Sequence, residues 1–211
     1  HGLYELDRET GALQLRLRPE GEVMPVRSIV EHKPGVLLLA SDEGLTRYCP
    51  GTEERQTLKA QLNHPHALND SYLQTLYFDR EGALWVGTYF GGVNYFSPEG
   101  DNFIHYRRQE QGLTARIISV MAQAEGNNLW IGSDDNGFFH WDRQTNQYRH
   151  FMPQGKRPFS PTYHNIHALM QDGDKLYVGM YMGGLDIIDL KSGAVRNYMP
   201  STSSQSLYAT G

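Results

Sequence analysis

One short sequence unit recurs along the whole chain, and this recurrence limits the possible folds more than any other feature of the sequence. The clearest copy runs through Leu84-Trp85-Val86-Gly87-Thr88 and Gly91-Gly92-Val93 to Tyr95-Phe96. The second glycine of the Gly-Gly pair, or its equivalent, falls at positions 2, 44, 92, 137 and 184. Successive copies are therefore about 42 to 48 residues apart, which is the period of four-stranded sheets that stack around a common axis.

Each copy divides into four strand-like segments that are separated by turn-forming residues. In the copy around Trp85 these segments are 72–78, 83–87, 92–96 and 103–107. In the copy around Trp130 they are 117–122, 128–132, 137–141 and 147–150. No stretch shows a sustained 3.6-residue apolar periodicity, so helix should be scarce. The sequence therefore predicts an all-β fold, a β-propeller of four-stranded antiparallel blades.

The period also divides the chain into about four blades with a partial unit at each end, as in a fragment of a larger propeller. The expected units are 1–24 (the end of a blade), 25–70 (a degenerate blade), 71–115, 116–161 and 162–205 (blades) and 206–211 (the start of the next blade). The chain begins at His1 instead of Met, and Ser206-Leu207-Tyr208 near its end resembles a new inner strand. We therefore expect a piece of a ring, or an open array whose ends are covered by something else.

Three sets of residues recur at fixed places in the unit, and each has a physical reason. Large rings that can fill the space between neighbouring blades are Trp85, Trp130 and Tyr177. Glycines whose missing Cβ permits close sheet packing are Gly87, Gly132 and Gly179. Carboxylates that can stabilise the turn after a strand are Asp7, Asp142 and Asp189.

Composition excludes some classes of protein and leaves others open. The formal net charge of −5, with no basic stripe along the sequence, argues against a nucleic-acid partner, because the phosphate backbone demands clustered cations. Cys49 is the only cysteine, so no intrachain disulfide can form, and we expect it to be a buried small residue. No apolar run approaches the ~18 residues of a membrane span.

The pattern Leu-Trp-Ile-Gly-Thr, Gly-Gly-Leu, Phe-Asp and Ser-Leu closely resembles the two-component regulator propeller repeat. The matching segments are 84–88, 91–93, 129–133, 183–185 and 206–207. The unit 25–70 departs from the pattern at Leu39-Ala40, where the family has Trp or Ile and then Gly. The resemblance implies the periplasmic sensor region of a hybrid two-component histidine kinase, as in gut Bacteroides-type bacteria that sense polysaccharide fragments. It further implies additional blades, a small β-sandwich, one membrane helix, a kinase and a response regulator outside this chain.

Candidate ligand-binding residues lie in the loops of one propeller face, where propellers generally bind ligands. Those loops join the second strand of a blade to the third, or lead into the next blade. The candidates are Asp42, Tyr89, Phe90, Asp134, Asp135, Asn136, His164 and Tyr181. Aromatic rings beside acidic and amide groups suit a sugar, whose C–H faces stack on rings while its hydroxyls form hydrogen bonds. The alternative is that Tyr89, Phe90 and Tyr181 merely pack between adjacent blades.

Neither a metal site nor a catalytic site is expected. His64 and His66, with His164 and His167 further along, hint only weakly at the three or four converging ligands that a metal needs. The run 134–136 lacks the length and carboxylate count of a calcium loop. The sequence holds no nucleophile elbow, zinc-protease motif or phosphate loop, and no cofactor is expected.

The expected function is that of an extracytoplasmic, periplasmic ligand-sensing propeller that responds to an oligosaccharide or another polysaccharide-derived molecule. Expected partners are such a ligand and a second copy of the chain, through the terminal blades or as a receptor dimer, because exposed sheet edges invite strand pairing. A membrane would be reached only through a downstream helix absent here. Two alternatives stay open: a protein-interaction or dimerisation scaffold without a small ligand, and a propeller lyase or glycosidase.

Overall fold

The computed structural model describes residues 2–17, 25–61, 64, 66–100, 103–106 and 112–199. Within these residues all regular secondary structure is β-strand, and no helix is present. Accordingly, the described part of the chain has no helix that is long and apolar enough to cross a membrane. The expected unit 206–211 and the expected strand end at Arg107 lie outside the described residues.

Sixteen of the strands in the described residues form four-stranded antiparallel sheets, each built from four consecutive strands. One sheet contains β3 (Val26–Lys33), β4 (Val36–Ser41), β5 (Gly44–Cys49) and β6 (Glu54–Leu58). The next contains β7 (Leu73–Phe78), β8 (Leu84–Thr88), β9 (Val93–Phe96) and β10 (Phe103–Tyr106). The others contain β11 (Ile118–Gln123), β12 (Leu129–Ser133), β13 (Phe138–Asp142) and β14 (Gln147–Phe151), then β15 (Ile166–Asp172), β16 (Lys175–Met180), β17 (Gly184–Asp189) and β18 (Val195–Tyr198).

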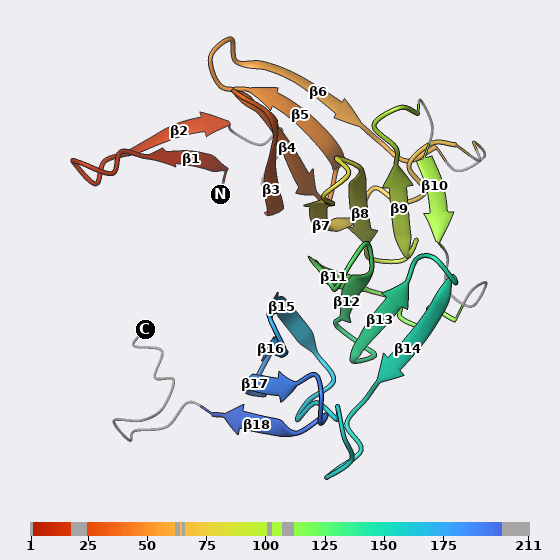
Figure 1. Ribbon diagram of the computed structural model, residues 1–211. Helices are drawn as coiled ribbons and strands as arrows, with labels where there is room; N and C mark the ends of the chain where they lie inside the picture. The colour runs from red at the N-terminus through yellow and green to blue at the C-terminus, as the bar shows by residue number, and fades with distance from the viewer. Residues whose placement is uncertain are drawn as a thin grey trace.

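The sheets fan out in an arc around a common centre (Figure 1). The first strands of successive sheets contact one another, β3 with β7, β7 with β11 and β11 with β15, so these strands form the inner edge of the arc. A hairpin of β1 (Leu3–Leu6) and β2 (Leu13–Leu17) lies at one end of the arc, and the β15–β18 sheet lies at the other. The predicted fold, part of a propeller with four-stranded antiparallel blades, is confirmed.

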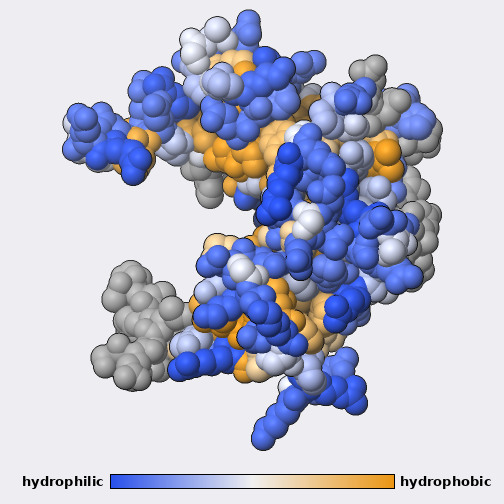
Figure 2. Space-filling view, viewed as in Figure 1, coloured by the Kyte–Doolittle hydropathy of each residue, from blue (hydrophilic) through white to orange (hydrophobic). Residues whose placement is uncertain are grey.

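Apolar cores lie between neighbouring sheets instead of within one sheet, because a single sheet has no way to cover its own faces. Trp85 of β8 is fully buried against the inner strand and third strand of the following sheet. Trp130 of β12 is buried in the same way against the β15–β18 sheet. Figure 2 shows hydrophilic side chains over most of the visible outer rim, with apolar side chains gathered toward the inner side of the arc.

Tyr177 differs from the other two rings of its set. It occupies the position of Trp85 and Trp130 in β16, yet it is only half-buried. No sheet within the described residues covers that face of β15–β18, so these residues do not test the prediction that Tyr177 fills a space between blades. Cys49 is likewise half-buried and not buried, because it is the last residue of β5, next to the turn at Pro50.

The repeated glycines are needed for close packing, as predicted. A Cβ at Gly87 would lie 2.6 Å from Cγ2 of Thr75 in the same sheet and 2.8 Å from Cγ2 of Ile118 in the next sheet. A Cβ at Gly132 would lie 2.5 Å from Cγ1 of Val120. Distances this short are steric overlaps, so neither position accepts a larger residue without a shift of its neighbours.

The predicted turn-stabilising carboxylates are confirmed. Oδ1 of Asp142 accepts hydrogen bonds from the backbone N–H groups of Gln144 and Thr145, each 3.0 Å long. Asp7 and Asp189 bond the N–H groups of their own turns in the same way. The hydrogen bond from the Thr145 N–H is the main reason why the pKa of Asp142 lies below its ordinary value, since bonds to the charged form favour ionisation.

Candidate functional site

The loops β4–β5, β8–β9, β12–β13 and β16–β17 all join the second strand of a sheet to its third strand, so they lie at the same edge of each sheet. We call this edge the loop face. In three of the sheets a hydroxyl at the end of the second strand closes the loop: Ser41, Thr88 and Ser133 each bond backbone groups two to four residues ahead. These short, internally bonded loops hold the predicted residues in fixed places.

Asp42 is paired with Arg27 of β3. Nε of Arg27 lies 2.8 Å from Oδ1 of Asp42, and Nη2 lies 3.2 Å from Oδ2. This two-point contact raises the pKa of the guanidinium, first through the hydrogen bond to Asp42. Because a paired carboxylate carries no uncompensated charge, Asp42 acts on a ligand only together with Arg27.

Tyr89 and Phe90 form an aromatic pair at the tip of the β8–β9 loop. Their ring centroids are 4.6 Å apart in an edge-to-face arrangement. The backbone N–H of Phe90 donates to Oδ2 of Asp70 over 2.8 Å, and the N–H of Tyr89 donates to the carbonyl of Tyr72. Phe90 is 70% exposed, so it does not pack between blades, whereas Tyr89 is half-buried. Phe90 is thus a fixed, accessible apolar ring.

Asp134 and Tyr181 meet at one side chain, that of His167 in β15. Nε2 of His167 lies 2.8 Å from Oδ1 of Asp134, which belongs to the preceding sheet. The Tyr181 ring stacks on the His167 ring with centroids 5.8 Å apart and planes 26° apart. All three side chains are accessible, with Tyr181 59% exposed. The arrangement offers a ring and two hydrogen-bonding groups across the seam between two sheets.

Asp135 and Asn136 hold the loop face together instead of presenting free groups. Oδ1 of Asp135 accepts from Oγ of Ser133 over 2.6 Å and from the N–H of Arg116 over 3.1 Å. Nδ2 of Asn136 donates to Oγ1 of Thr114 over 2.7 Å. Both side chains therefore fasten the β12–β13 loop to the segment that enters β11.

His164 lies in the connection that enters β15, and it is half-buried. Its carbonyl accepts the N–H of Gly137 over 2.8 Å, and its ring lies 4.5 Å from the Tyr163 ring, centroid to centroid. His164 is therefore a neighbour of the Asp134 loop, and it reaches that loop through its backbone.

A second set of residues lies at the loop face, and of these only His167 was considered from the sequence, as a weak metal-ligand candidate. Each inner strand carries a β-bulge at the same register, opposite the end of the second strand. The bulged residues are Arg27, Gln74, Ser119 and His167. Bulges commonly re-aim a side chain near a functional site. These four side chains all lie at a β-bulge and differ in chemistry. The sequence alone does not indicate that they are bulged, because a bulge is recognised only from the strand register.

Contacts of the bulged residues cross the seams between sheets. Oγ of Ser119 donates to the carbonyl of Ile166 in the next sheet, and His167 reaches back to Asp134. Nε2 of Gln74 is buried and has no hydrogen-bond partner in the described residues. A buried polar group without a partner requires an explanation, such as a bound water or ligand atom.

Histidine and acidic residues do not gather into a metal-type cluster within the described residues. The rings of His64 and His66 lie edge-to-face with centroids 6.4 Å apart. His167 pairs with a single carboxylate, which is far from a complete ligand set.

Comparison with known proteins identifies the repeat. Residues 67–90 match the family model for the two component regulator propeller, which confirms the resemblance over a stretch that includes β7, β8, Tyr89 and Phe90. No curated protein matches the chain.

Several solved structures share the fold. The extracellular domain of the hybrid two component system BT3049 from B. thetaiotaomicron is 23% identical, with a TM-score of 0.71 over 82% of this chain and 24% of that one. Virginiamycin B lyase from Staphylococcus aureus is 10% identical, with a TM-score of 0.65 over 95% of this chain and 63% of that one. The computationally designed Ika8 protein is 19% identical, with a TM-score of 0.55 over 96% and 56%. At these identities the likeness is one of fold, and this chain spans about a quarter of the BT3049 domain.

Proposed function

We propose that the chain is an extracytoplasmic ligand-sensing propeller segment of a hybrid two-component sensor histidine kinase. The observation that carries the proposal is the match of residues 67–90 to the two component regulator propeller. That stretch ends in Tyr89 and Phe90 at the loop face. The shared fold with an extracellular domain of a hybrid two component system supports the same assignment.

The ligand that fits the loop face is an oligosaccharide or another polysaccharide fragment. Phe90 and Tyr181 expose rings on which the C–H face of a sugar can stack. The Arg27–Asp42 and His167–Asp134 pairs provide donors and acceptors for its hydroxyls. A few fixed polar groups beside apolar rings are typical of small-molecule sites.

Signalling requires that the ligand bind two arrangements of the receptor with different affinity, since equal affinity would shift no equilibrium. His167, Asp134 and Tyr181 belong to two sheets and meet at their seam. A ligand held by these three residues would bind best at one separation of the two sheets. The seam between β11–β14 and β15–β18 is therefore the element through which we propose that binding is transmitted.

The test is calorimetry of the chain against a panel of neutral and acidic glycans. We expect saturable binding of one glycan class, weakened about threefold to tenfold by Phe90→Ala or Tyr181→Ala through loss of ring stacking. Tyr4→Ala is the matched control, because Tyr4 is 47% exposed on β1 and belongs to none of the four loops of the loop face. Equal loss in all three variants, or no binding by any glycan, would contradict the proposal.

A dimerisation scaffold is the second candidate, and exposed apolar side chains at both ends of the arc favour it. Leu6 and Leu13 of the β1–β2 hairpin are 55% and 67% exposed, and Met170 of β15 is 55% exposed. Such side chains are typical of interaction surfaces. Sedimentation at increasing concentration should then show self-association that Leu13→Glu abolishes. A species that stays monomeric at high concentration would exclude this role.

We propose no catalytic role for the chain. The fold is shared with a lyase, but a shared fold does not carry a shared activity. Long incubation with glycans should release no new reducing ends. Release that disappears on Asp134→Asn would overturn this part of the proposal.

A further inference from the structure

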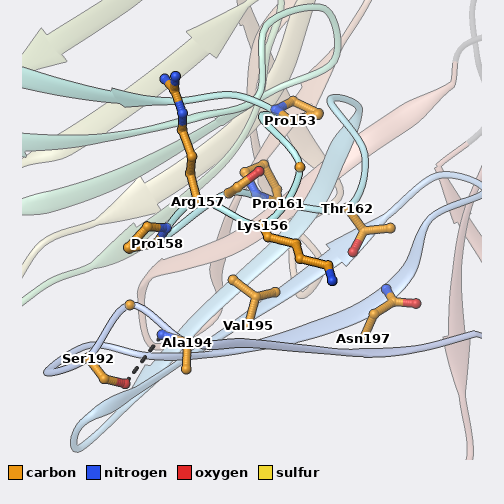
Figure 3. A pocket seen from close by; sticks show the side chains of 13 residues that line it. Pro153, Lys156, Arg157, Pro158, Pro161, Thr162, Ser192, Ala194, Val195 and Asn197 are labelled. Carbon is orange, nitrogen blue, oxygen red and sulfur yellow. Dashed lines mark hydrogen bonds between the residues drawn. The ribbon is translucent and has the colours of Figure 1, made fainter.

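A pocket of about 490 Å³ lies at the outer rim of the arc, and none of Phe90, Asp134 and Tyr181 lines it. One wall is the connection from β14 to β15, residues 153–162. The other wall is the β17–β18 turn and the outer strand β18 (Figure 3). The volume falls within the range of small-molecule sites, ~300–1,000 Å³. We call it the rim pocket.

The connection is fastened at its far end by a fully buried carboxylate, that of Asp186 in β17. Oδ2 of Asp186 accepts the N–H of Thr162 over 2.6 Å, and Oδ1 accepts the Thr162 hydroxyl over 2.8 Å. Oδ1 also accepts Nδ2 of Asn197 over 2.7 Å. One buried group thus fixes a residue of each wall, so the separation of the walls is set before any ligand arrives.

The middle of the connection is seated directly on the β17–β18 turn. The N–H of Phe159 donates to the carbonyl of Gly193 over 2.8 Å. A Cβ at Gly193 would lie 2.6 Å from Cβ of Pro158, and Gly193 has a φ of +72°, so only glycine fits this contact. Phe159 itself holds a φ of +60°. The pocket is therefore preformed, which lowers the ordering cost of binding.

The charge of the rim pocket is opposite to that of the chain. None of the described residues that line it is Asp or Glu, whereas Lys156 and Arg157 both line it on a chain of net charge −5. Figure 3 shows Lys156 reaching across the pocket toward Thr162 and Asn197, while Arg157 points away from them. Among the described residues no carboxylate pairs with Lys156. One unpaired cation therefore faces the pocket.

Asn197 contributes a hydrogen-bond acceptor to the pocket lining. Nδ2 of Asn197 donates to Asp186 and to the carbonyl of Gly183, which leaves its Oδ1 as the group turned to other partners. Val195 lies beside Lys156 and provides an apolar floor. A cation, an acceptor and an apolar floor match a molecule that carries one carboxylate, hydroxyls and C–H faces.

We propose that the rim pocket binds a carboxylate-bearing sugar residue, with its carboxylate at Lys156 Nζ and a hydroxyl donating to Asn197 Oδ1. The choice of a sugar as carrier of the carboxylate rests on the proposed function, and the anion preference rests on the pocket alone. An uncharged sugar of the same shape lacks the charge-assisted bond, so the site discriminates between the two.

The experiment compares glucuronate with glucose, which differ in the carboxylate, by amide chemical-shift titration of the chain. We expect saturable shifts at Val195 and Asn197 with glucuronate, and binding about ten- to a hundredfold weaker with glucose. Lys156→Gln should reduce glucuronate binding to the level of glucose. Lys175→Gln is the matched control, because Lys175 is an exposed lysine of β16 outside the pocket.

Each outcome decides the proposal. Equal affinity for glucose and glucuronate, unchanged binding by Lys156→Gln, or shifts that avoid β18 would each overturn it. Val195→Phe, which fills the pocket without removing the charge, must also abolish binding, because otherwise Lys156 acts only as a surface cation. The titration is independent of the loop face: Phe90→Ala should leave glucuronate binding unchanged, so failure here and failure of the proposed function give different results.

Discussion

Two neighbouring seams of the arc use the same repeat position with different chemistry. Between the β7–β10 and β11–β14 sheets the position holds Trp85, and Trp141 of the next sheet packs edge-on with centroids 5.2 Å apart. Between the β3–β6 and β7–β10 sheets the position holds Leu38, which pairs with the third strand at the same register. Its surroundings are mostly aliphatic. We call these the aromatic seam and the aliphatic seam.

Of these two seams, the aromatic one has a directional polar contact at the Trp85 position, whereas in the aliphatic seam the N–H of Leu76 donates to Oγ of Ser28 between the inner strands. Oδ2 of the buried Asp79 accepts Nε1 of Trp85 over 2.8 Å and Nη1 of Arg143 over 3.1 Å. Arg143 comes from the next sheet, and its guanidinium carbon lies 4.8 Å from the Trp85 ring centroid. The aromatic seam is thus fixed in position as well as packed, and we expect the aliphatic seam to open first.

The largest effect is expected from emptying the aromatic seam. Trp85→Ala removes a ring that is 0% exposed, and it should lower the free energy of unfolding by about 3–5 kcal/mol. Leu38→Ala, at the equivalent place in the aliphatic seam, should cost about 2–3 kcal/mol, since less volume is lost. Urea unfolding measures both. A larger loss for Leu38→Ala would reverse the comparison.

The next largest change in stability measures the contribution of the Asp79 hydrogen bonds to the aromatic seam, apart from the packing of the Trp85 ring. Asp79→Ala leaves the Trp85 N–H without its acceptor and Arg143 without one of its carboxylates, which should cost about 3 kcal/mol. Asp174→Ala removes a carboxylate that pairs with Lys191 on the exposed surface, and it should change stability by no more than about 0.5 kcal/mol. If the two variants unfold alike, the Asp79 contact does not fix the aromatic seam.

The fold could be predicted from the sequence because the same pattern of four strand-like segments occurs several times along the chain. The segment expected at 72–78 is β7 (Leu73–Phe78), and the one expected at 147–150 lies within β14. Periodicity determines which face of a strand is buried. It does not show which sheet covers that face, and Tyr177 is half-buried because no sheet within the described residues covers it.

The candidate site could be predicted only in part. The loops were found from their place between strands, so Phe90, Asp134 and Tyr181 were expected at one face. The bulged residues Gln74 and Ser119 were missed, because a bulge depends on the pairing of two strands and leaves no mark in either one. The rim pocket was missed for a related reason: Lys156 faces β18 only because Asp186 and Gly193 fasten the connection there.

A smaller change in stability should distinguish the two seams by the space available for a Cβ atom at one repeat position. Gly87→Ala forces a Cβ to within 2.6 Å of Thr75 and 2.8 Å of Ile118, and it should cost about 1–3 kcal/mol. The equivalent residue of the aliphatic seam is Ala40, which is buried with its Cβ in place. Ala40→Gly should cost about 0.5–1 kcal/mol from added backbone freedom alone. A neutral Gly87→Ala would show that the aromatic seam is not the tighter one.

The smallest effect concerns the turn that carries Arg143 into the aromatic seam. The pKa of Asp142 is lowered below its ordinary value, first by the Thr145 N–H bond, so its contribution to stability is present above the unfolded-state pKa and is lost as the pH falls through the folded-state pKa. Asp7 caps the β1–β2 turn through the same contacts, and its pKa is also lowered. Asp142→Asn should therefore lower stability at pH 7, and this loss should shrink as the pH falls through the folded-state pKa of Asp142. Asp7→Asn should change less, because its turn lies at the end of the arc and fastens no seam. NMR titration of the carboxyl groups measures the two pKa values, and acid unfolding measures the stability of the two variants. Equal losses of stability in Asp142→Asn and Asp7→Asn would mean that the Asp142 turn does not stabilise the aromatic seam.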